Sequence, residues 1–385
     1  SQGKGDKALT RKIAEDCDAM MGWLADYVGV KFSKPAKLVW PMLSRAHLVL
    51  GEVKPGGGQL AKDLMAKAKS LGVEMRFNTK GIALLTDEKT GAVTGVRVKD
   101  KKGLSDVHAK YGVVLATGGF SANQQLVTQY IGSAGAKMPI RGSRIIMGEN
   151  IRLVDPLFAK VVNVDQYHCG PIHGPTGANP LNIVNNGICV NRQAERFIDE
   201  GKTYVQMSRD TAAMTKGNWA FMIVDQTTHD MKKLANDWES YARNKAPVYQ
   251  ADTIEELAQQ IGVPPENLLA TMKRVNKFAE QKSDPDFNRL PEHLEKFNLK
   301  KGPYYALKAI RCFFLTLGGV TVTPSFEAKN PQGDVIPNLF VVGQDIGGLY
   351  DSSYDLRCEG SASSFAMTSG RVAALHALKA IEAGK

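Results

Sequence analysis

Two glycine-rich segments, far apart in the chain, constrain its fold more than any other feature. Residues 113–123 read VVLATGGFSAN and residues 338–348 read NLFVVGQDIGG. Each is a short apolar run that ends in glycines, which let a backbone approach a nucleotide closely. We therefore expect the two runs to be strand ends of one cofactor-binding sheet.

The length and composition predict a globular chain. Its 385 residues leave room for two or three domains, and 43% of them are hydrophobic. No stretch approaches the roughly 18 uncharged apolar residues of a membrane span. The N-terminal SQGKGDKALTRK has no hydrophobic signal-peptide core. The sequence therefore predicts no membrane span and does not identify the compartment.

The distribution of charge argues against nucleic acid as a partner. Lysine and arginine number 49 against 39 aspartates and glutamates, which gives a net charge of +10. The lysines are spread through amphipathic segments such as residues 60–72 rather than gathered in one basic stripe. An anionic small molecule remains compatible with this charge.

The cysteines predict no metal centre. They are odd in number and widely spaced, and they form no CxxC pair of the kind that binds zinc or an iron–sulfur cluster. We expect most of them to be buried free thiols. The five are Cys17, Cys169, Cys189, Cys312 and Cys358.

Periodicity predicts a mixed cofactor domain in the first part of the chain. Apolar residues at helical spacing predict helices over residues 6–28 and 59–71. Alternating patterns over 73–79 and 81–100 predict strands of a meander that leads into the run at 113. This mixture is typical of an α/β or α+β fold.

The middle of the chain differs in character and predicts an inserted domain. From about residue 163 to 302 polar loops surround the short strand GICVN and two helices, near residues 253–262 and 265–281. Pro265 is placed to open the second helix. The predicted division is 1–162 with 303–385 for the cofactor domain, which ends in a helix near 361–382, and 163–302 for the inserted domain.

The segment Gly56–Ala61 formally matches the pattern GxGxxA of dinucleotide-binding turns. Such a turn leaves an apolar strand directly, whereas Glu52, Val53, Lys54 and Pro55 precede this one. We therefore expect a glycine loop that caps a helix near the cofactor.

Five segments occur in the same order as in one known family. They are ATGGF, TIEELAQQIGVPPENLLATMKRVNKF, SDPDFNR, LTLGGV, and VVGQDIGGLY with the glycine-serine helix start that follows it. Over essentially its whole length the chain resembles the FAD-dependent fumarate reductase, urocanate reductase and 3-ketosteroid dehydrogenase family, which are flavoproteins of the succinate dehydrogenase type. The resemblance implies FAD as cofactor, a Rossmann-like FAD-binding domain and an inserted α+β capping domain.

The beginning of the chain departs from this family. Members open with a βαβ unit that carries GxGxxG, and nothing in this sequence matches it. We therefore expect the chain to lack the family's first segment and, with it, a pyrophosphate site at a helix N-terminus.

The resemblance implies a set of cofactor-binding residues at three places. Two glycine turns and the start of the last helix would contact FAD, and the free N–H groups of that helix would face the flavin pyrimidine ring. Ser361 could alternatively serve only as the N-cap of this helix. The set comprises Thr117, Gly118, Gly119, Gly343, Gln344, Ser361 and Ala362.

The resemblance also implies the residues that act on the substrate. His168 matches a substrate histidine, Arg209 matches an arginine that passes a proton, and Arg357 matches an arginine that binds a carboxylate. Because a guanidinium does not titrate in proteins, Arg209 can act only as a relay. Tyr354 lies in a loop about three residues longer than that of fumarate reductases, where ketosteroid dehydrogenases use tyrosine as acid or base.

Two departures argue against a dicarboxylate substrate. Fumarate reductases have a histidine pair where this chain has Phe314 and Leu315, and their Thr-Glu pair is replaced near Asn179 and Pro180. Each unmet polar partner costs about 1–3 kcal/mol. We therefore expect the substrate pocket to be less polar at one end than the pocket of fumarate reductases.

These observations predict an FAD-dependent oxidoreductase acting on CH–CH or C=C bonds. The leading hypothesis is reduction of an activated alkene conjugated to a carboxylate, by hydride transfer from flavin N5 and protonation by arginine. A ketosteroid-type dehydrogenase that uses Tyr354, and a non-catalytic flavoprotein fragment, are the alternatives. The sequence identifies no electron donor and leaves the compartment open between bacterial cytoplasm and periplasm.

Overall fold

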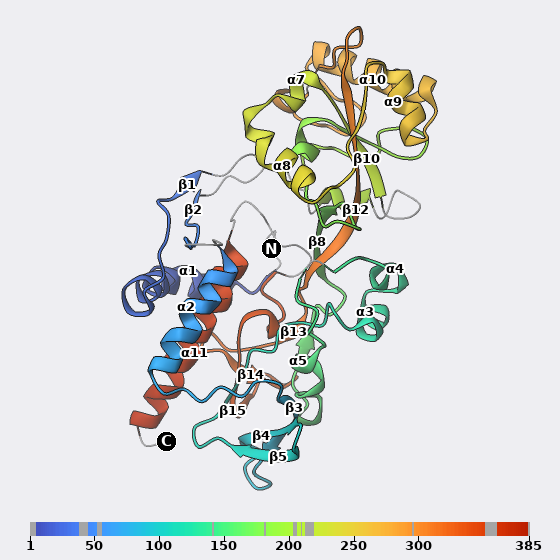
Figure 1. Ribbon diagram of the computed structural model, residues 1–385. Helices are drawn as coiled ribbons and strands as arrows, with labels where there is room; N and C mark the ends of the chain where they lie inside the picture. The colour runs from blue at the N-terminus through green and yellow to red at the C-terminus, as the bar shows by residue number, and fades with distance from the viewer. Residues whose placement is uncertain are drawn as a thin grey trace.

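A long strand, β12 (Tyr304–Thr316), connects two bodies in the computed structural model (Figure 1). The upper body, formed by residues 183–310, is called the cap below, and the other elements form the lower body. The structure describes residues 5–37, 45–51, 56–140, 142–180, 182–202, 206–208, 210–211, 219–294, 296–350 and 360–383. The domain boundaries given above remain a prediction.

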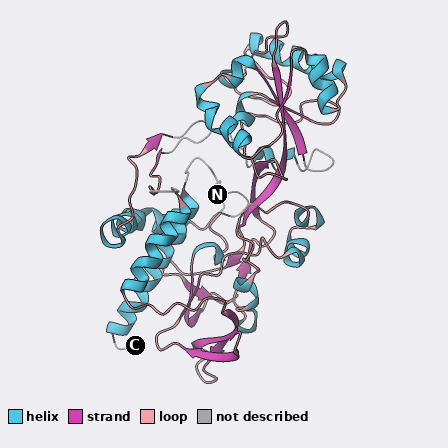
Figure 2. Cartoon of the chain, viewed as in Figure 1, coloured by secondary structure: helices cyan, strands magenta, loops and turns pink. Residues whose placement is uncertain are grey.

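The cap is built on an antiparallel sheet with helices around it (Figure 2). Within the cap the strand order is β11-β12-β10-β9, and β8, which precedes the cap in the chain, extends this sheet by pairing with the lower half of β12. The strands are β8 (Tyr167–Ile172), β9 (Ile188–Val190), β10 (Trp219–Asp225) and β11 (Tyr249–Ala251), and the helices are α7 (Gln226–His229), α8 (Ala235–Arg243), α9 (Ile254–Ile261) and α10 (Pro265–Gln281).

The lower body contains several small sheets. One has the order β14-β15-β6, and β3, β4 and β5 form an antiparallel meander. The strands are β1 (Ala36–Lys37), β2 (Arg45–Ala46), β3 (Lys80–Thr86), β4 (Val93–Asp100), β5 (Gly103–His108), β6 (Val113–Leu115), β7 (Val161–Val162), β13 (Gly319–Val320), β14 (Glu327–Lys329) and β15 (Val335–Val341).

Helices cover this lower body, and α1 packs along α11. Leu9 of α1 and Val372 of α11 share a buried core with Val341 of β15. The helices are α1 (Lys7–Gly22), continued by a π-helical turn (Trp23–Val28), α2 (Gly57–Ser70), α3 (Gln124–Tyr130), α4 (Ser133–Ala136), α5 (Glu149–Arg152) and α11 (Ser361–Glu382).

The two glycine-rich runs are neighbours, as the sequence predicts. Strands β6 and β15 are parallel, and Val341 stands opposite Leu115. Parallel neighbours end at the same sheet edge, so the glycines that follow them lie together. The helices expected near residues 6–28, 59–71, 253–262, 265–281 and 361–382 are also present. Pro265 occupies the first turn of α10, as expected.

One predicted strand is wrong. Residues 73–79 form turns and irregular backbone rather than a strand. The side chains of Val73 and Phe77 are 54% and 68% exposed. An alternating pattern specifies a strand only where a neighbouring strand and a core are available, and no strand pairs with these residues among those the structure describes.

The prediction of buried thiols is confirmed for two of the cysteines. Cys169 and Cys189 are buried thiols that form no disulfide, and the thiol of Cys17 is half-buried. The side chain of Cys312 and the whole of Cys358 lie outside the described residues. Within the described ranges, none of the helices has the length and apolar character needed to cross a membrane.

Candidate functional site

Two turns meet at the ends of β6 and β15. The backbone N–H of Val342 donates to the carbonyl of Leu115 at 3.0 Å, which continues the pairing of the two strands. Asp345 Oδ2 then accepts hydrogen bonds from the backbone N–H of Thr117 at 2.5 Å and from its hydroxyl at 3.0 Å. The turn at residues 117–119 is therefore joined directly to the turn at residues 343–345.

Glycine allows the first turn to fit between its neighbours. A Cβ atom at Gly119 would lie 2.0 Å from Thr316 Oγ1 and 2.9 Å from Gln344 Nε2. Gly118 has a φ of +77°, which other residues rarely adopt. The backbone of residues 117–119 therefore presses against both β12 and the second turn.

A cavity of about 240 Å³ opens beside these turns. This volume is near the lower end for ligand pockets, about 300 Å³, so it suits part of a dinucleotide rather than all of it. Most of the surrounding side chains are apolar. The lining residues are Leu315, Thr316, Leu317, Gly343, Gln344, Ile346, Tyr350, Ala362, Ser363, Phe365 and Ala366.

The N-terminus of α11 contributes one wall of the cavity. Gly360 is the N-cap of this helix, so the alternative that Ser361 is the N-cap is wrong, and among the described residues no side chain caps the helix. The first intrahelical hydrogen bond runs from Ser364 N–H to the carbonyl of Gly360, at 2.9 Å. The N–H groups of residues 361–363 have no intrahelical acceptor and carry a partial positive charge. This end of the helix suits an electron-rich carbonyl edge or an anion.

Asp345 is the most perturbed titratable group near the cavity. Its side chain is fully buried, and this burial raises the pKa of the carboxyl to about 7, against the opposing hydrogen bonds from Thr117 and from the backbone of Gly118. Asp345 was not among the residues predicted from the sequence. The signal available was an acidic residue two positions after the glycine that follows β15.

His168 lies next to the wall of the cavity. It is on β8, directly opposite Leu315 of β12, and its side chain is only 3% exposed. Leu315 in turn lines the cavity. The strand pairing thus brings His168 close to the two glycine turns and the start of α11.

Three predicted catalytic residues, Arg209, Tyr354 and Arg357, lie outside the described residues. The structure brings together the predicted cofactor residues Gly343, Gln344 and Ala362 as lining of one cavity. Thr117, Gly118 and Gly119 form the adjoining turn, and Ser361 begins the helix. Their roles remain predictions.

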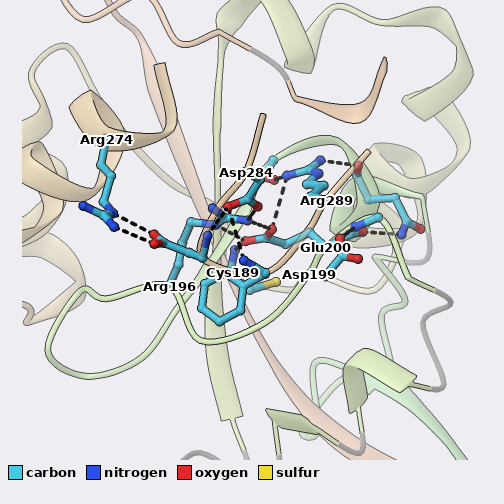
Figure 3. Close-up of polar contacts among 12 residues, drawn as sticks. Cys189, Arg196, Asp199, Glu200, Arg274, Asp284 and Arg289 are labelled. Carbon is cyan, nitrogen blue, oxygen red and sulfur yellow. Dashed lines mark hydrogen bonds and ion pairs between the residues drawn. The ribbon is translucent and has the colours of Figure 1, made fainter. Parts of the chain in front are cut away.

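A polar cluster lies inside the cap (Figure 3), and none of its residues lines the cavity. Glu200 forms ion pairs with Arg196 at 2.7 Å and with Arg289 at 3.3 Å, and Arg196 also pairs with Asp284 at 3.0 Å. All four side chains are at most 4% exposed. An outer pair, Arg274 with Asp286, continues the cluster toward solvent.

This ion cluster fixes the backbone around it. Arg289 donates to the carbonyls of Gly187 and Asn185, at 2.9 and 2.8 Å. The amide of Asn185 donates in turn to the carbonyls of Glu200 and Lys202, at 2.6 and 2.8 Å. The cluster therefore anchors the segment that leads toward residues 206–211. No group of histidine, cysteine or acidic residues in the described ranges has an arrangement that could hold a metal ion.

Comparison with known proteins agrees with this geometry. Residues 1–360 match the family described as FAD binding domain. The chain belongs to this FAD-binding family. FAD is accordingly the cofactor, and the two glycine turns, the cavity and the uncapped helix start are chemically suited to hold part of it.

The relatives include both reductases and dehydrogenases. NADH:acrylate oxidoreductase of Vibrio harveyi is 27% identical over 384 residues, which is 95% of this chain and 36% of that protein. Vinyl phenol reductase of Lactiplantibacillus plantarum is 26% identical, over 98% of this chain and 81% of that protein. This chain thus spans about a third of the first relative's length and most of the second's.

A solved structure shares the fold. The open conformation of a flavocytochrome c3 fumarate reductase superposes with a TM-score of 0.76 at 24% identity, over 98% of this chain and 65% of that one. The fold is therefore the predicted mixture of helices and sheets, with an FAD-binding domain and a capping domain. The chain is grouped with FAD-dependent reductases and dehydrogenases of the fumarate reductase type, as the sequence motifs predict.

Proposed function

We propose that this FAD-binding chain reduces an activated alkene that is conjugated to a carboxylate. The observation that carries the proposal is the cavity between β12 and the start of α11, which combines an apolar lining with an uncapped helix N-terminus. FAD, when bound and reduced by an electron donor, would supply the hydride for one alkene carbon. The predicted catalytic side chains would hold the substrate against the flavin and deliver a proton to the other carbon.

Three of the four predicted catalytic residues have a task in this proposal. His168 donates a hydrogen bond that orients the substrate, and Arg357 binds its carboxylate with two parallel hydrogen bonds. Arg209 relays the proton, since its guanidinium stays charged and can only pass a proton on within an organised site. Fixing the carboxylate polarises the double bond and makes it a better hydride acceptor.

The apolar lining favours a substrate with an apolar or aromatic remainder. Leu315, Leu317 and Phe365 lie around the cavity, and Tyr350 packs edge-on against Phe365 with ring centroids 6.3 Å apart. A dicarboxylate would place its second charge among such groups at a cost in desolvation. The anionic acceptor is therefore a monocarboxylate such as acrylate or an aryl acrylate.

The test is oxidation of the chemically reduced holoprotein, followed by the flavin absorbance in the absence of oxygen. Acrylate and cinnamate should reoxidise the flavin faster than fumarate does, and 4-vinylphenol, which has no carboxylate, should react slowest. Equal rates with 4-vinylphenol and cinnamate would contradict a role for the carboxylate. A purified protein without a flavin spectrum would instead support the non-catalytic alternative.

Two variants separate the reductase from the ketosteroid-type dehydrogenase. Arg209→Lys should abolish nearly all alkene reduction while the protein keeps its flavin. Tyr354→Phe should then have a minor effect. A dominant loss in Tyr354→Phe, with Arg209→Lys still active, would favour proton transfer by tyrosine and the reverse reaction.

A further inference from the structure

The cavity lies between two hydrophobic cores. Leu317 belongs to a core that is made almost entirely of cap residues, and Leu315 packs against that core. Ile346 and Phe365 belong to a core of the lower body, and all four side chains line the cavity. One wall of the cavity therefore belongs to each core, so a ligand in this space is held by both.

Tyr350 joins the two walls. Its side chain is half-buried, lines the cavity and packs against both cores. Its ring stands edge-on to that of Phe365, with the ring centroids 6.3 Å apart and 84° between the ring planes. Phe365 is tilted in turn against the fully buried Phe326, at 6.4 Å. Three aromatic rings thus run from the core of the lower body to the cavity, and Tyr350 is the last of them.

The polar side chains of the cavity lie toward the glycine turn and the helix start. Thr316 and Gln344 adjoin Gly119, since a Cβ atom there would meet them at 2.0 and 2.9 Å. Ser363 is in the first turn of α11. Of the described residues that line the cavity, none carries a charge. The wall on the side of the cap core therefore offers mainly apolar and aromatic surface.

An aromatic ring is the substrate group that fits this wall best. Against Tyr350 and Phe365 it gains edge-to-face contacts in addition to burial of its apolar surface. We propose that Tyr350 determines substrate specificity by holding an aromatic ring on the β-carbon of an α,β-unsaturated monocarboxylate. The inference rests on the proposed function and narrows its substrate class to 3-aryl acrylates. The glycine turns and the start of α11 remain available to the cofactor.

The first measurement is the binding of saturated analogues to the oxidised holoprotein by isothermal titration calorimetry. These analogues have no double bond to reduce, so affinity is measured without turnover. A cyclohexyl ring has at least as much apolar surface as a phenyl ring, so burial alone predicts that it binds at least as well. We expect the wild-type protein to bind 3-phenylpropionate more tightly than 3-cyclohexylpropionate. The opposite order would overturn the proposal without any variant.

The second measurement repeats these titrations with Tyr350→Leu, which keeps an apolar side chain between the two cores but removes the ring. Its affinity for 3-phenylpropionate should fall roughly 2- to 10-fold, the range of one aromatic pair. Its affinity for 3-cyclohexylpropionate should change much less. Tyr350→Phe, which keeps the ring, should bind both analogues as the wild type does.

Tyr249 provides the matched control. It is a half-buried tyrosine of β11 that stands edge-on to Phe221, with ring centroids 6.0 Å apart, and it does not line the cavity. Tyr249→Leu removes the same kind of ring contact elsewhere and should leave the affinity for 3-phenylpropionate unchanged. Flavin content and melting temperature show that each variant is folded and loaded.

Steady-state kinetics then compare cinnamate with acrylate. In Tyr350→Leu the ratio of kcat/KM for cinnamate to that for acrylate should fall by the factor seen in binding, mainly through a higher KM for cinnamate. An unchanged ratio would overturn the inference and leave alkene reduction standing, as would equal losses of affinity for both ring analogues or an equal effect of Tyr249→Leu. A protein that reduces neither substrate would instead contradict the proposed function.

Discussion

Arg196 and Glu200, four residues apart in the cap, form a buried ion pair through two parallel hydrogen bonds of 3.0 and 2.7 Å. Glu200 also accepts hydrogen bonds from Arg289 and from the backbone N–H of Cys189, at 3.3 and 2.9 Å. One carboxylate thus balances two buried guanidinium groups and also binds the backbone of β9. We therefore expect Glu200 to contribute more to the stability of the cap than any of the ion pairs on its surface.

We expect Glu200→Gln to lower the free energy of unfolding by about 3–5 kcal/mol, because it leaves two buried arginines with only Asp284 as acidic partner. Urea denaturation followed by circular dichroism measures the change. Arg274→Gln, which breaks the exposed pair with Asp286, is the control and should have little effect. Equal effects of the two substitutions would show that the buried cluster contributes no more than a surface pair.

A side chain at Gly119 should disrupt the cofactor site. Gly119→Ala places a Cβ atom 2.0 Å from Thr316 Oγ1, so either β12 or the turn must move. We expect the purified variant to retain less flavin per mole of protein than the wild type, as measured by absorbance. Gly370→Ala is the control: a Cβ atom there meets nothing within 4 Å, and alanine in a helix is favoured by about 0.5–1 kcal/mol. Normal flavin content in Gly119→Ala would mean that the tight contact is easily relieved.

His168→Asn should reduce turnover without removing the flavin. Loss of a hydrogen bond to a charged substrate is worth about 2–3 kcal/mol, which corresponds to a decrease of roughly 30- to 150-fold in kcat/KM. Steady-state kinetics with acrylate provide the measurement. His173→Asn, at a half-buried histidine beyond the end of β8 that contacts Thr176, is the matched control and should stay near wild-type activity. Similar losses in both variants would point to a general disturbance of this strand.

Sequence patterns predicted the helices and strands correctly where the local signal and the tertiary structure agree. The apolar runs that end in glycine predicted that β6 and β15 would lie together, and helical periodicity predicted α1, α2, α9, α10 and α11. The alternation at residues 73–79 predicted a strand that does not form, because the pattern contains no information on whether another strand is available to pair with it.

Local sequence patterns could not predict contacts between residues that lie far apart in the chain. Asp345 and Thr117 are 228 positions apart, and only the folded chain shows that the carboxyl accepts both donors of Thr117. The buried cluster of Glu200 and Arg289 likewise joins residues 89 positions apart. Charged residues in polar loops are usually solvated, so nothing in their sequence predicted burial. The roles of Arg209, Tyr354 and Arg357 still rest on the family resemblance.

The stability of the cofactor-free protein should depend on pH through Asp345. Its pKa is raised to about 7 in the folded protein from an ordinary value of 3.8, so the folded state binds a proton more tightly than the unfolded state. The stabilisation is fully present below about pH 4 and is lost as the pH rises through about 7. Its steepest slope is about 1.4 kcal/mol per pH unit.

The amide side chain in Asp345→Asn cannot ionise, so the variant lacks this pH-dependent contribution to the free energy of unfolding. The difference in free energy of unfolding between Asp345→Asn and wild type should therefore increase in favour of the variant between about pH 4 and pH 7 and level off above it. Urea denaturation at a series of pH values measures this difference. Subtracting the two proteins cancels the contributions of Asp199 and Asp237, whose pKa values burial also raises. A difference that stays constant over this range would mean that Asp345 is solvated in solution, and that its carboxylate is not held in the buried environment between the two turns.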